Sequence, residues 1–108
     1  MTQFDERERA FENKFAHDQE MQFKVTVRRN KLLGLWAAEK LGLRAGEADN
    51  YAKEVIKSDF EEVGDEDVIR KLVADFAEKA VDVSDQEIRE TLAAKASEAK
   101  IQIMGEIS

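Results

Sequence analysis

The apolar positions at the start of the chain follow two different helical phases. Phe4, Phe11 and Phe15 are seven and four residues apart, so they share one narrow face of a helix. The same face continues with Asp18 and Gln22, which are polar. An apolar face resumes about 80° further around the helix axis, at Met21, Val25, Leu32 and Trp36. A helix buried on one face keeps one phase, so we interpret residues 1–19 as an N-terminal arm and residues 20–108 as a separate domain.

Helical periodicity continues through the rest of the chain. Apolar residues recur at spacings of three and four, helix-forming residues are abundant and proline is missing. The pattern predicts four helices, over residues 20–41, 46–62, 65–80 and 84–104.

The ends of these helices carry recognisable signals. Gly42 suits the position after a helix end, where glycine adopts the left-handed conformation at least cost. Asp65 is a good N-cap for the third helix. The fourth helix has a capping box that begins at Ser84, with Val83 and Ile88 placed as a hydrophobic staple. The second helix lacks a comparable start signal.

Short links between amphipathic helices favour packing between sequence neighbours, which predicts an all-α fold, a four-helix bundle. The expected core is small for a chain of 108 residues. It would be built from Leu32, Leu35, Trp36, Leu41, Leu43, Tyr51, Val55, Ile56, Leu72, Phe76, Ile88 and Leu92.

Charge is unevenly distributed along the chain. Residues 1–20 have a net charge of −3, residues 21–44 of +5 and residues 45–108 of −9, for a total of −7. An acidic protein binds nucleic acid poorly, so nucleic acid is not an expected partner. The basic segment has two interpretations: it pairs with the acidic helices of the same chain, or it meets a ligand that carries phosphate.

Targeting signals are not visible in the sequence. No apolar run approaches the ~20 residues that span a bilayer, and the charged N-terminus lacks the apolar region of a secretory signal. The absence of cysteine fits a reducing compartment. We therefore expect a cytoplasmic protein without direct membrane insertion.

Catalytic and metal-binding patterns are also weak. His17 is the single histidine and has no second histidine at metal-ligand spacing, which argues against a zinc site. Gly34, Gly42 and Gly46 match neither glycine-rich phosphate-binding pattern. No nucleophile, metal set or acid–base pair stands out, so we expect a protein that is not an enzyme and has no metal site.

One basic cluster is a candidate binding site. Arg28, Arg29 and Lys31 could contact phosphates, and the indole of Trp36 could stack on a base. These four residues are our candidates for contacting a nucleotide. The alternative is that Trp36 belongs to the core and the basic residues, with Lys40, pair with acidic helices.

The N-terminal phenylalanines also allow two interpretations. The first helix could curve so that all three rings pack internally. However, the surrounding residues are densely charged, and a segment with few apolar side chains buries too little surface to be stable alone. Such a segment often folds in the groove of a partner, using anchors spaced by four and seven residues, which is the interpretation that we favour.

Three stretches of the sequence form an unusual pattern: FDERERAFE and KFAHD within residues 4–18, RRNKLLGLWAAEKLGL at residues 28–43, and YAKEV, DFEE and GDEDV within residues 51–68. Together they resemble the alphaproteobacterial ATPase inhibitor zeta subunit. The likeness covers most of the chain and is weakest in the last helix.

This resemblance implies a small four-helix bundle that binds the catalytic head of the rotary ATP synthase and blocks ATP hydrolysis. It also implies that the N-terminal segment is the inhibitory part, mobile in the free protein, and that ADP or ATP can bind as a regulatory ligand without any required cofactor. The likeness assigns the partner contacts to Phe4, Arg7, Arg9, Phe11, Lys14 and Phe15.

The expected function is therefore non-catalytic inhibition of ATP hydrolysis by a protein that is monomeric when free. The alternative is an adenine-nucleotide-sensing module that regulates a partner protein, in which a bound nucleotide changes the packing of the first helix.

Overall fold

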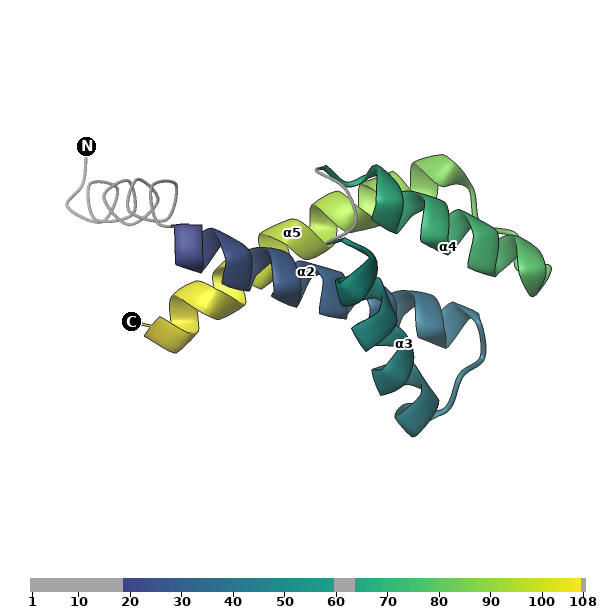
Figure 1. The fold of residues 1–108 in the computed structure, drawn as a ribbon, viewed down its shortest axis with the longest axis horizontal. Coiled ribbons are helices and arrows are strands. Elements are labelled where there is room, and N and C mark those ends of the chain that lie inside the picture. Colours follow the sequence, from purple (N-terminus) through teal and green to yellow (C-terminus); the bar gives the residue numbers. More distant parts are fainter. Residues whose placement is uncertain (1–18, 60–63, 108) are drawn as a thin grey trace.

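The computed structural model describes residues 19–59 and 64–107 (Figure 1). The elements in these residues are four helices, labelled as in the figure: α2 (Gln19–Lys40), α3 (Ala45–Ser58), α4 (Glu66–Glu78) and α5 (Asp85–Ile107). This arrangement confirms the predicted all-α four-helix bundle.

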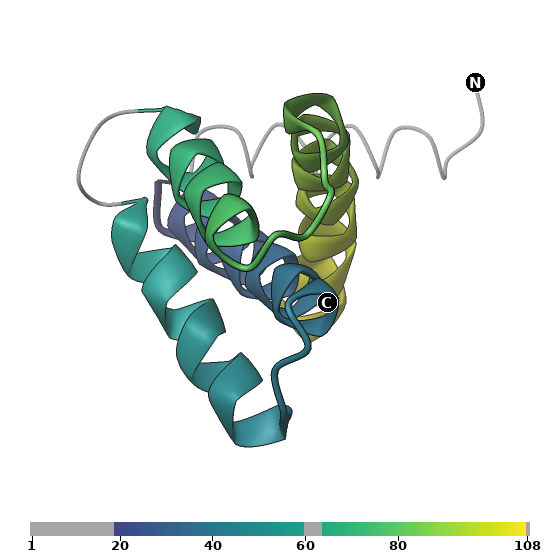
Figure 2. The same ribbon diagram turned by 90° about the vertical axis from the view of Figure 1, so that its right-hand side faces the viewer.

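Helix α2 is the central element of the bundle. It packs along both α3 and α5, whereas α4 has fewer contacts, with α3 and α5. α2 and α5 run in opposite directions, so α5 ends near the start of α2 (Figure 1). Seen from the end of the molecule, α4 lies above α2, between α3 and α5 (Figure 2).

The core collects apolar side chains from all four helices. Half of the twelve expected core residues are buried and the other half are only partly buried. The buried cluster consists of Leu33, Ala37, Ala38, Tyr51, Val55, Val68, Ile69, Leu72, Phe76, Ile88 and Leu92.

The predicted phase of the first bundle helix is wrong. The stripe of Met21, Val25, Leu32 and Trp36 is only partly buried. The fully buried residues of α2 are instead Asn30, Leu33, Gly34, Ala37 and Ala38. Small residues allow the helix backbones to approach closely, and a Cβ placed on Gly34 would lie 2.7 Å from the Cα of Ala52 in α3. Hydrophobicity alone does not mark such a contact surface.

The end of α2 agrees with the sequence prediction. Gly42 has a φ of +76°, in the left-handed region that favours glycine. The Gly42 N–H donates to the carbonyl of Glu39 at 3.1 Å, and the Leu43 N–H donates to the carbonyl of Ala38 at 3.0 Å. These two bonds form a Schellman motif that satisfies the last carbonyls of α2.

Helix α4 ends in the same motif without glycine. The Ala80 N–H donates to the carbonyl of Ala77 at 3.1 Å, and the Val81 N–H donates to the carbonyl of Phe76 at 2.8 Å. Ala80 occupies the left-handed position with a φ of 55°. A residue with a Cβ is strained in this conformation.

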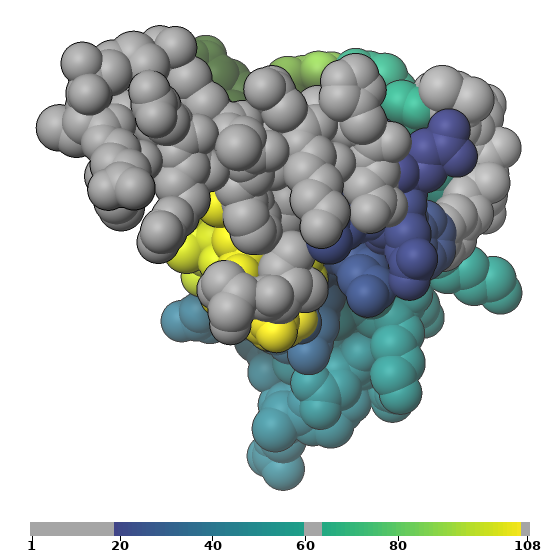
Figure 3. Space-filling model, turned by 90° about the vertical axis from the view of Figure 1, so that its left-hand side faces the viewer, coloured from purple at the N-terminus to yellow at the C-terminus, as the bar shows by residue number. Residues whose placement is uncertain are grey.

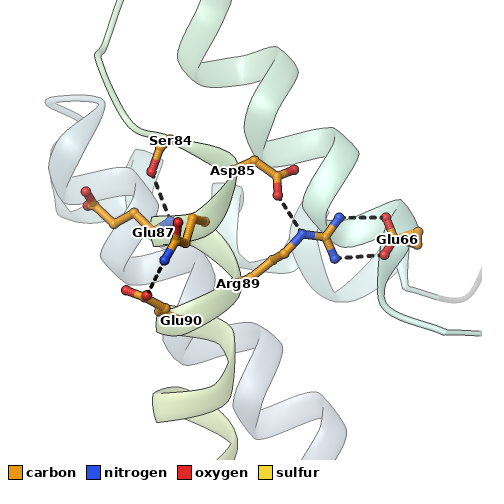
Figure 4. A network of polar contacts seen from close by, with 7 residues as sticks. Glu66, Ser84, Asp85, Glu87, Arg89 and Glu90 are labelled. Carbon is orange, nitrogen blue, oxygen red and sulfur yellow. Dashed lines mark hydrogen bonds and ion pairs between the residues drawn. The ribbon is translucent and has the colours of Figure 1, made fainter.

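The other helix ends differ in part from the predictions. The Ser84 Oγ accepts a hydrogen bond from the Glu87 N–H at 3.0 Å, which confirms the expected N-cap of α5 (Figure 4). Asp65 stands at the N-cap position of α4 but makes no side-chain cap hydrogen bond. Helix α3 ends at Ser58 rather than at Glu62, and α5 continues to Ile107 beyond the predicted end at Met104.

Candidate functional site

The first predicted site is the N-terminal arm, whose residues Phe4, Arg7, Arg9, Phe11, Lys14 and Phe15 lie outside the described residues. The described part of the chain starts at Gln19, the first residue of α2. The first turns of α2 and the last turns of α5 lie at the same end of the molecule (Figure 3). The start of the described chain therefore lies beside the end of α5.

Arg28 fixes α2 to the end of α5. Its guanidinium donates to Oε1 of Gln102 at 2.7 Å and to Oε1 of Glu106 at 2.6 Å. The side chain is partly exposed. Arg28 was predicted to contact phosphate, but here it is paired with a carboxylate of the same chain.

Arg29 belongs to a polar cluster on a different side of α2. Its guanidinium lies 3.0 Å from Oδ1 of Asp65 and 3.5 Å from Oδ2 of Asp59. Its Nε donates to Oδ1 of Asn30 at 3.1 Å, and the Asn30 amide donates to Asp59 at 3.0 Å. Asn30 is 1% exposed. The cluster thus joins the middle of α2 to the end of α3 and the start of α4.

Lys31 and Trp36 complete the predicted nucleotide site. Lys31 is exposed. Trp36 is partly buried and meets the ring of Phe76 edge-on, with centroids 5.9 Å apart. The Nζ of Lys40 lies 5.4 Å from the Trp36 ring and 3.5 Å from Oε2 of Glu87. This environment places the indole against the core, as the alternative interpretation expected.

The four candidate nucleotide ligands therefore do not share one pocket. Arg28 reaches towards α5, Arg29 reaches towards the junction of α3 and α4, and Lys31 faces outwards. Both arginines pair with carboxylates, which also agrees with the interpretation that the basic segment pairs within the chain.

A cavity of about 360 Å³ opens between α4 and α5, next to Arg29. Ile69, Leu92 and other apolar residues line it, and charged side chains form part of its wall. The full lining consists of Arg29, Asp65, Glu66, Ile69, Arg89, Leu92, Ala93 and Ala96.

Arg89 is the residue of this cavity that sequence reasoning missed. Its guanidinium holds both carboxylate oxygens of Glu66, at 2.9 and 3.0 Å, and its Nε donates to Asp85 at 2.5 Å (Figure 4). The hydrogen bond from Arg89 lowers the pKa of Glu66, with a further contribution from the positive charge. The spacing of Asp85 and Arg89 indicates a pair within one helix, but nothing in the sequence indicates the contact with α4.

A second polar cluster lies between α3 and α4. The Tyr51 hydroxyl donates to Oδ2 of Asp75 at 2.7 Å. Lys71 Nζ lies 3.1 Å from the same oxygen and 3.6 Å from Glu54, and sits 5.0 Å from the centre of the Tyr51 ring. Burial, followed by the hydrogen bond to Asp75, raises the pKa of Tyr51.

Neither a metal-ligand cluster nor a membrane-spanning helix was found in the described residues. Within residues 19–59 and 64–107, no group of three or more His, Cys, Asp or Glu side chains could hold a metal ion. None of the helices in these two ranges is both long and apolar enough to cross a membrane. The polar clusters join helices to one another, so their geometry indicates a structural role.

Comparison with known proteins identifies the family. A search of curated proteins found no match. A structure solved by solution NMR is 49% identical, has a TM-score of 0.72 and covers 80% of this chain and 98% of its own. The sequence model of the ATPase inhibitor subunit zeta matches residues 1–102, which include the arm and nearly all of the bundle. The chain therefore belongs to the ATPase inhibitor subunit zeta family.

Proposed function

We propose that this protein is a non-catalytic inhibitor of ATP hydrolysis by the rotary ATP synthase, and that its arm inserts into the catalytic head. The observation that carries this proposal is the family match, because it extends from residue 1 to residue 102 and so includes the arm as well as the bundle. Residues 1–19 would then bind the catalytic head, and the remainder of the chain would anchor this arm.

The chemistry of the arm suits a wedge between moving subunits. In a helix within a cleft of the head, Phe4, Phe11 and Phe15 would be buried, and each would contribute ~1.5–3 kcal/mol less the cost of ordering the arm. Arg7, Arg9 and Lys14 would then be available for acidic side chains along the same cleft. Blocking rotation in this way requires no catalytic group from the inhibitor.

The bundle supports this role as a holder. Two neighbouring arginines of α2 fix the helix from different sides, Arg28 to α5 and Arg29 to the ends of α3 and α4. The helix to which the arm is attached is therefore fastened to all three other helices. An inhibitory segment that leaves from such a base is restricted at one end, which lowers the entropy lost on binding.

Deletion of residues 1–15 tests the proposal. The truncated protein should fail to inhibit ATP hydrolysis by the purified head, while its far-UV circular dichroism and urea midpoint should show a folded bundle. A full-length F4A/F11A/F15A variant controls for chain length and should lose most of the inhibition. If the truncated protein inhibits as strongly as the full chain, the arm does not act as proposed.

A nucleotide-sensing role is a second candidate, favoured by the cavity beside Arg29 and Arg89. Its polar wall and apolar floor could accept a small anionic ligand with a planar ring, provided that the arginines exchange their carboxylate partners. Titration with ADP and ATP, followed by the fluorescence of Trp36, tests this role. An unchanged signal at millimolar nucleotide, together with no heat of binding by calorimetry, would exclude it.

A further inference from the structure

The basic side chains of the bundle fall into two groups. Most of them pair with carboxylates, including Lys24, Arg28, Arg29, Lys40, Arg70, Lys71, Arg89 and Lys95. Lys31, Lys53 and Lys57 are exposed and have no hydrogen bond or ion pair with any residue that the structure describes. Arg44 and Lys79 are also exposed and lack a described partner, but they stand at the start of α3 and the end of α4, whereas the three lysines belong to the adjacent helices α2 and α3.

The register of α2 and α3 brings these three lysines together. Asn30 of α2 bonds to Asp59 just after α3, and Gly34 of α2 lies against Ala52. The two helices are thus antiparallel. Lys31, which follows Asn30, is level with Lys57, and Lys53 lies one turn earlier in α3.

Lys31 and Lys53 also lie on the same side of this helix pair, with Lys57 at its outer edge. On α3, Glu54 and Tyr51 contact side chains of α4, and Ala52 contacts α2. At about 100° per residue, Lys53 then lies on the side of α3 that is turned away from α4, and Lys57 lies at the outer edge of this side, one turn further on. On α2, Asn30 and Gly34 face α3 and Trp36 meets Phe76 of α4. The same geometry therefore turns Lys31 away from α4.

Apolar side chains lie between the cations. Leu35, one turn after Lys31, and Ile56, next to Lys57, are only partly buried. We call the surface formed by Lys31, Leu35, Lys53, Ile56 and Lys57 the lysine face. Asp49, one turn before Lys53, is an exposed acid on the same side of α3. The combination of positive charge and accessible apolar surface is typical of a protein contact.

We propose that the lysine face docks on an acidic surface of the ATPase catalytic head, as a second contact in addition to the arm. This inference rests on the proposed inhibitory function. Charge complementarity identifies the partner surface as one that is rich in carboxylates, because lysine is a compact, strongly hydrated charge that steers association. The net charge of −7 disfavours nucleic acid as the occupant. The face would orient the bundle so that the arm meets its cleft.

The experiment compares matched variants in binding to the purified head and in inhibition of its ATP hydrolysis, each across a range of NaCl concentrations. The variant K53Q/K57Q should weaken binding about fivefold, and K31Q/K53Q/K57Q about tenfold. Both variants should retain full inhibition at saturating concentration, since the arm is intact, and the triple variant should show a shallower salt dependence. The control R44Q/K79Q removes two exposed cations that also lack a described partner, from the start of α3 and the end of α4, and should bind as wild type does.

Several outcomes would overturn the inference. One is a triple variant with wild-type affinity and salt dependence; another is a control variant that is weakened equally. A triple variant that keeps its affinity for the head but loses ADP binding would assign the face to a phosphate ligand instead. If the wild-type protein binds the head without inhibiting it, the proposed function fails, while the binding data still test the face. If the wild-type protein does not bind the head, both proposals fail.

Discussion

Single residues in this bundle show where local geometry and burial affect stability. Ala80 has a left-handed backbone at a position where α2 uses glycine. Tyr51 is a buried residue whose hydroxyl donates a hydrogen bond to the carboxylate of Asp75. Each feature has a measurable energetic consequence.

Replacing Ala80 with glycine should stabilise the protein by about 0.5–1 kcal/mol, because glycine adopts a φ of 55° without the clash of a Cβ. Chemical denaturation monitored by circular dichroism measures this change. The control is Ala74→Gly, on the exposed side of α4, which should destabilise by about 1 kcal/mol. An unchanged or lower stability in A80G would show that the left-handed residue carries no strain.

Replacing Tyr51 with phenylalanine should cost about 1 kcal/mol at neutral pH, through loss of the hydrogen bond to Asp75. The variant should also respond differently to alkali. Because the pKa of Tyr51 is raised in the folded protein, only the unfolded chain ionises just above pH 10.0, and stability falls as the pH rises past this value. Unfolding curves between pH 8 and pH 11 should decline less steeply for Y51F than for wild type; parallel curves would contradict the role of Tyr51.

At the scale of the helix, the spacing of residues in the sequence predicted the helices themselves better than it predicted the contacts between them. Four helices and the left-handed Gly42 were predictable because periodicity and capping are local properties. The buried face of α2 was not, because Gly34, Ala37 and Ala38 contribute little hydrophobicity and the importance of Gly34 appears only in the close approach of α3. Asp65 was predicted as a cap, yet its carboxylate pairs with Arg29, which is distant in sequence.

The Gly34→Ala substitution tests this close approach. The new Cβ would meet the backbone of Ala52 at 2.7 Å, and a backbone atom cannot move aside as a flexible side chain does. The helices must separate, at a cost of about 1–3 kcal/mol. Gly105→Ala is the matched control, since nothing lies within 4 Å of its Cβ position, and should be neutral or slightly stabilising. Urea unfolding of both variants distinguishes a contact effect from helix propensity.

At the scale of the whole molecule, α2 joins the other three helices through polar contacts. Asp59 follows α3, Asp65 precedes α4 and Glu106 belongs to α5, and each of them pairs with α2. The candidate site could be predicted from sequence only as a set of charges. Which cations are neutralised and which remain free depends on tertiary contacts, so Arg28, Arg29 and Lys31 looked equivalent in the sequence but are not.

Neighbouring arginines provide a matched test of these contacts. Arg29→Ala should destabilise the bundle by about 2 kcal/mol, because Asp59, only 11% exposed, would lose its cationic partner. Arg28→Ala should cost less than about 1 kcal/mol, since its partner Glu106 is 53% exposed. Urea unfolding, followed by both circular dichroism and Trp36 fluorescence, gives the two values. Equal losses would show that burial of the ion pair is unimportant here.

The antiparallel pairing of α2 and α5 has a practical consequence for experiments. A fusion partner or affinity tag attached beyond α5 would emerge near Gln19. If the N-terminal segment binds as proposed, such a tag would compete for space with its partner. The turn at Gly42, at the opposite end of α2, is exposed and far from this region. A fluorophore introduced at that turn would report on binding without obstructing it.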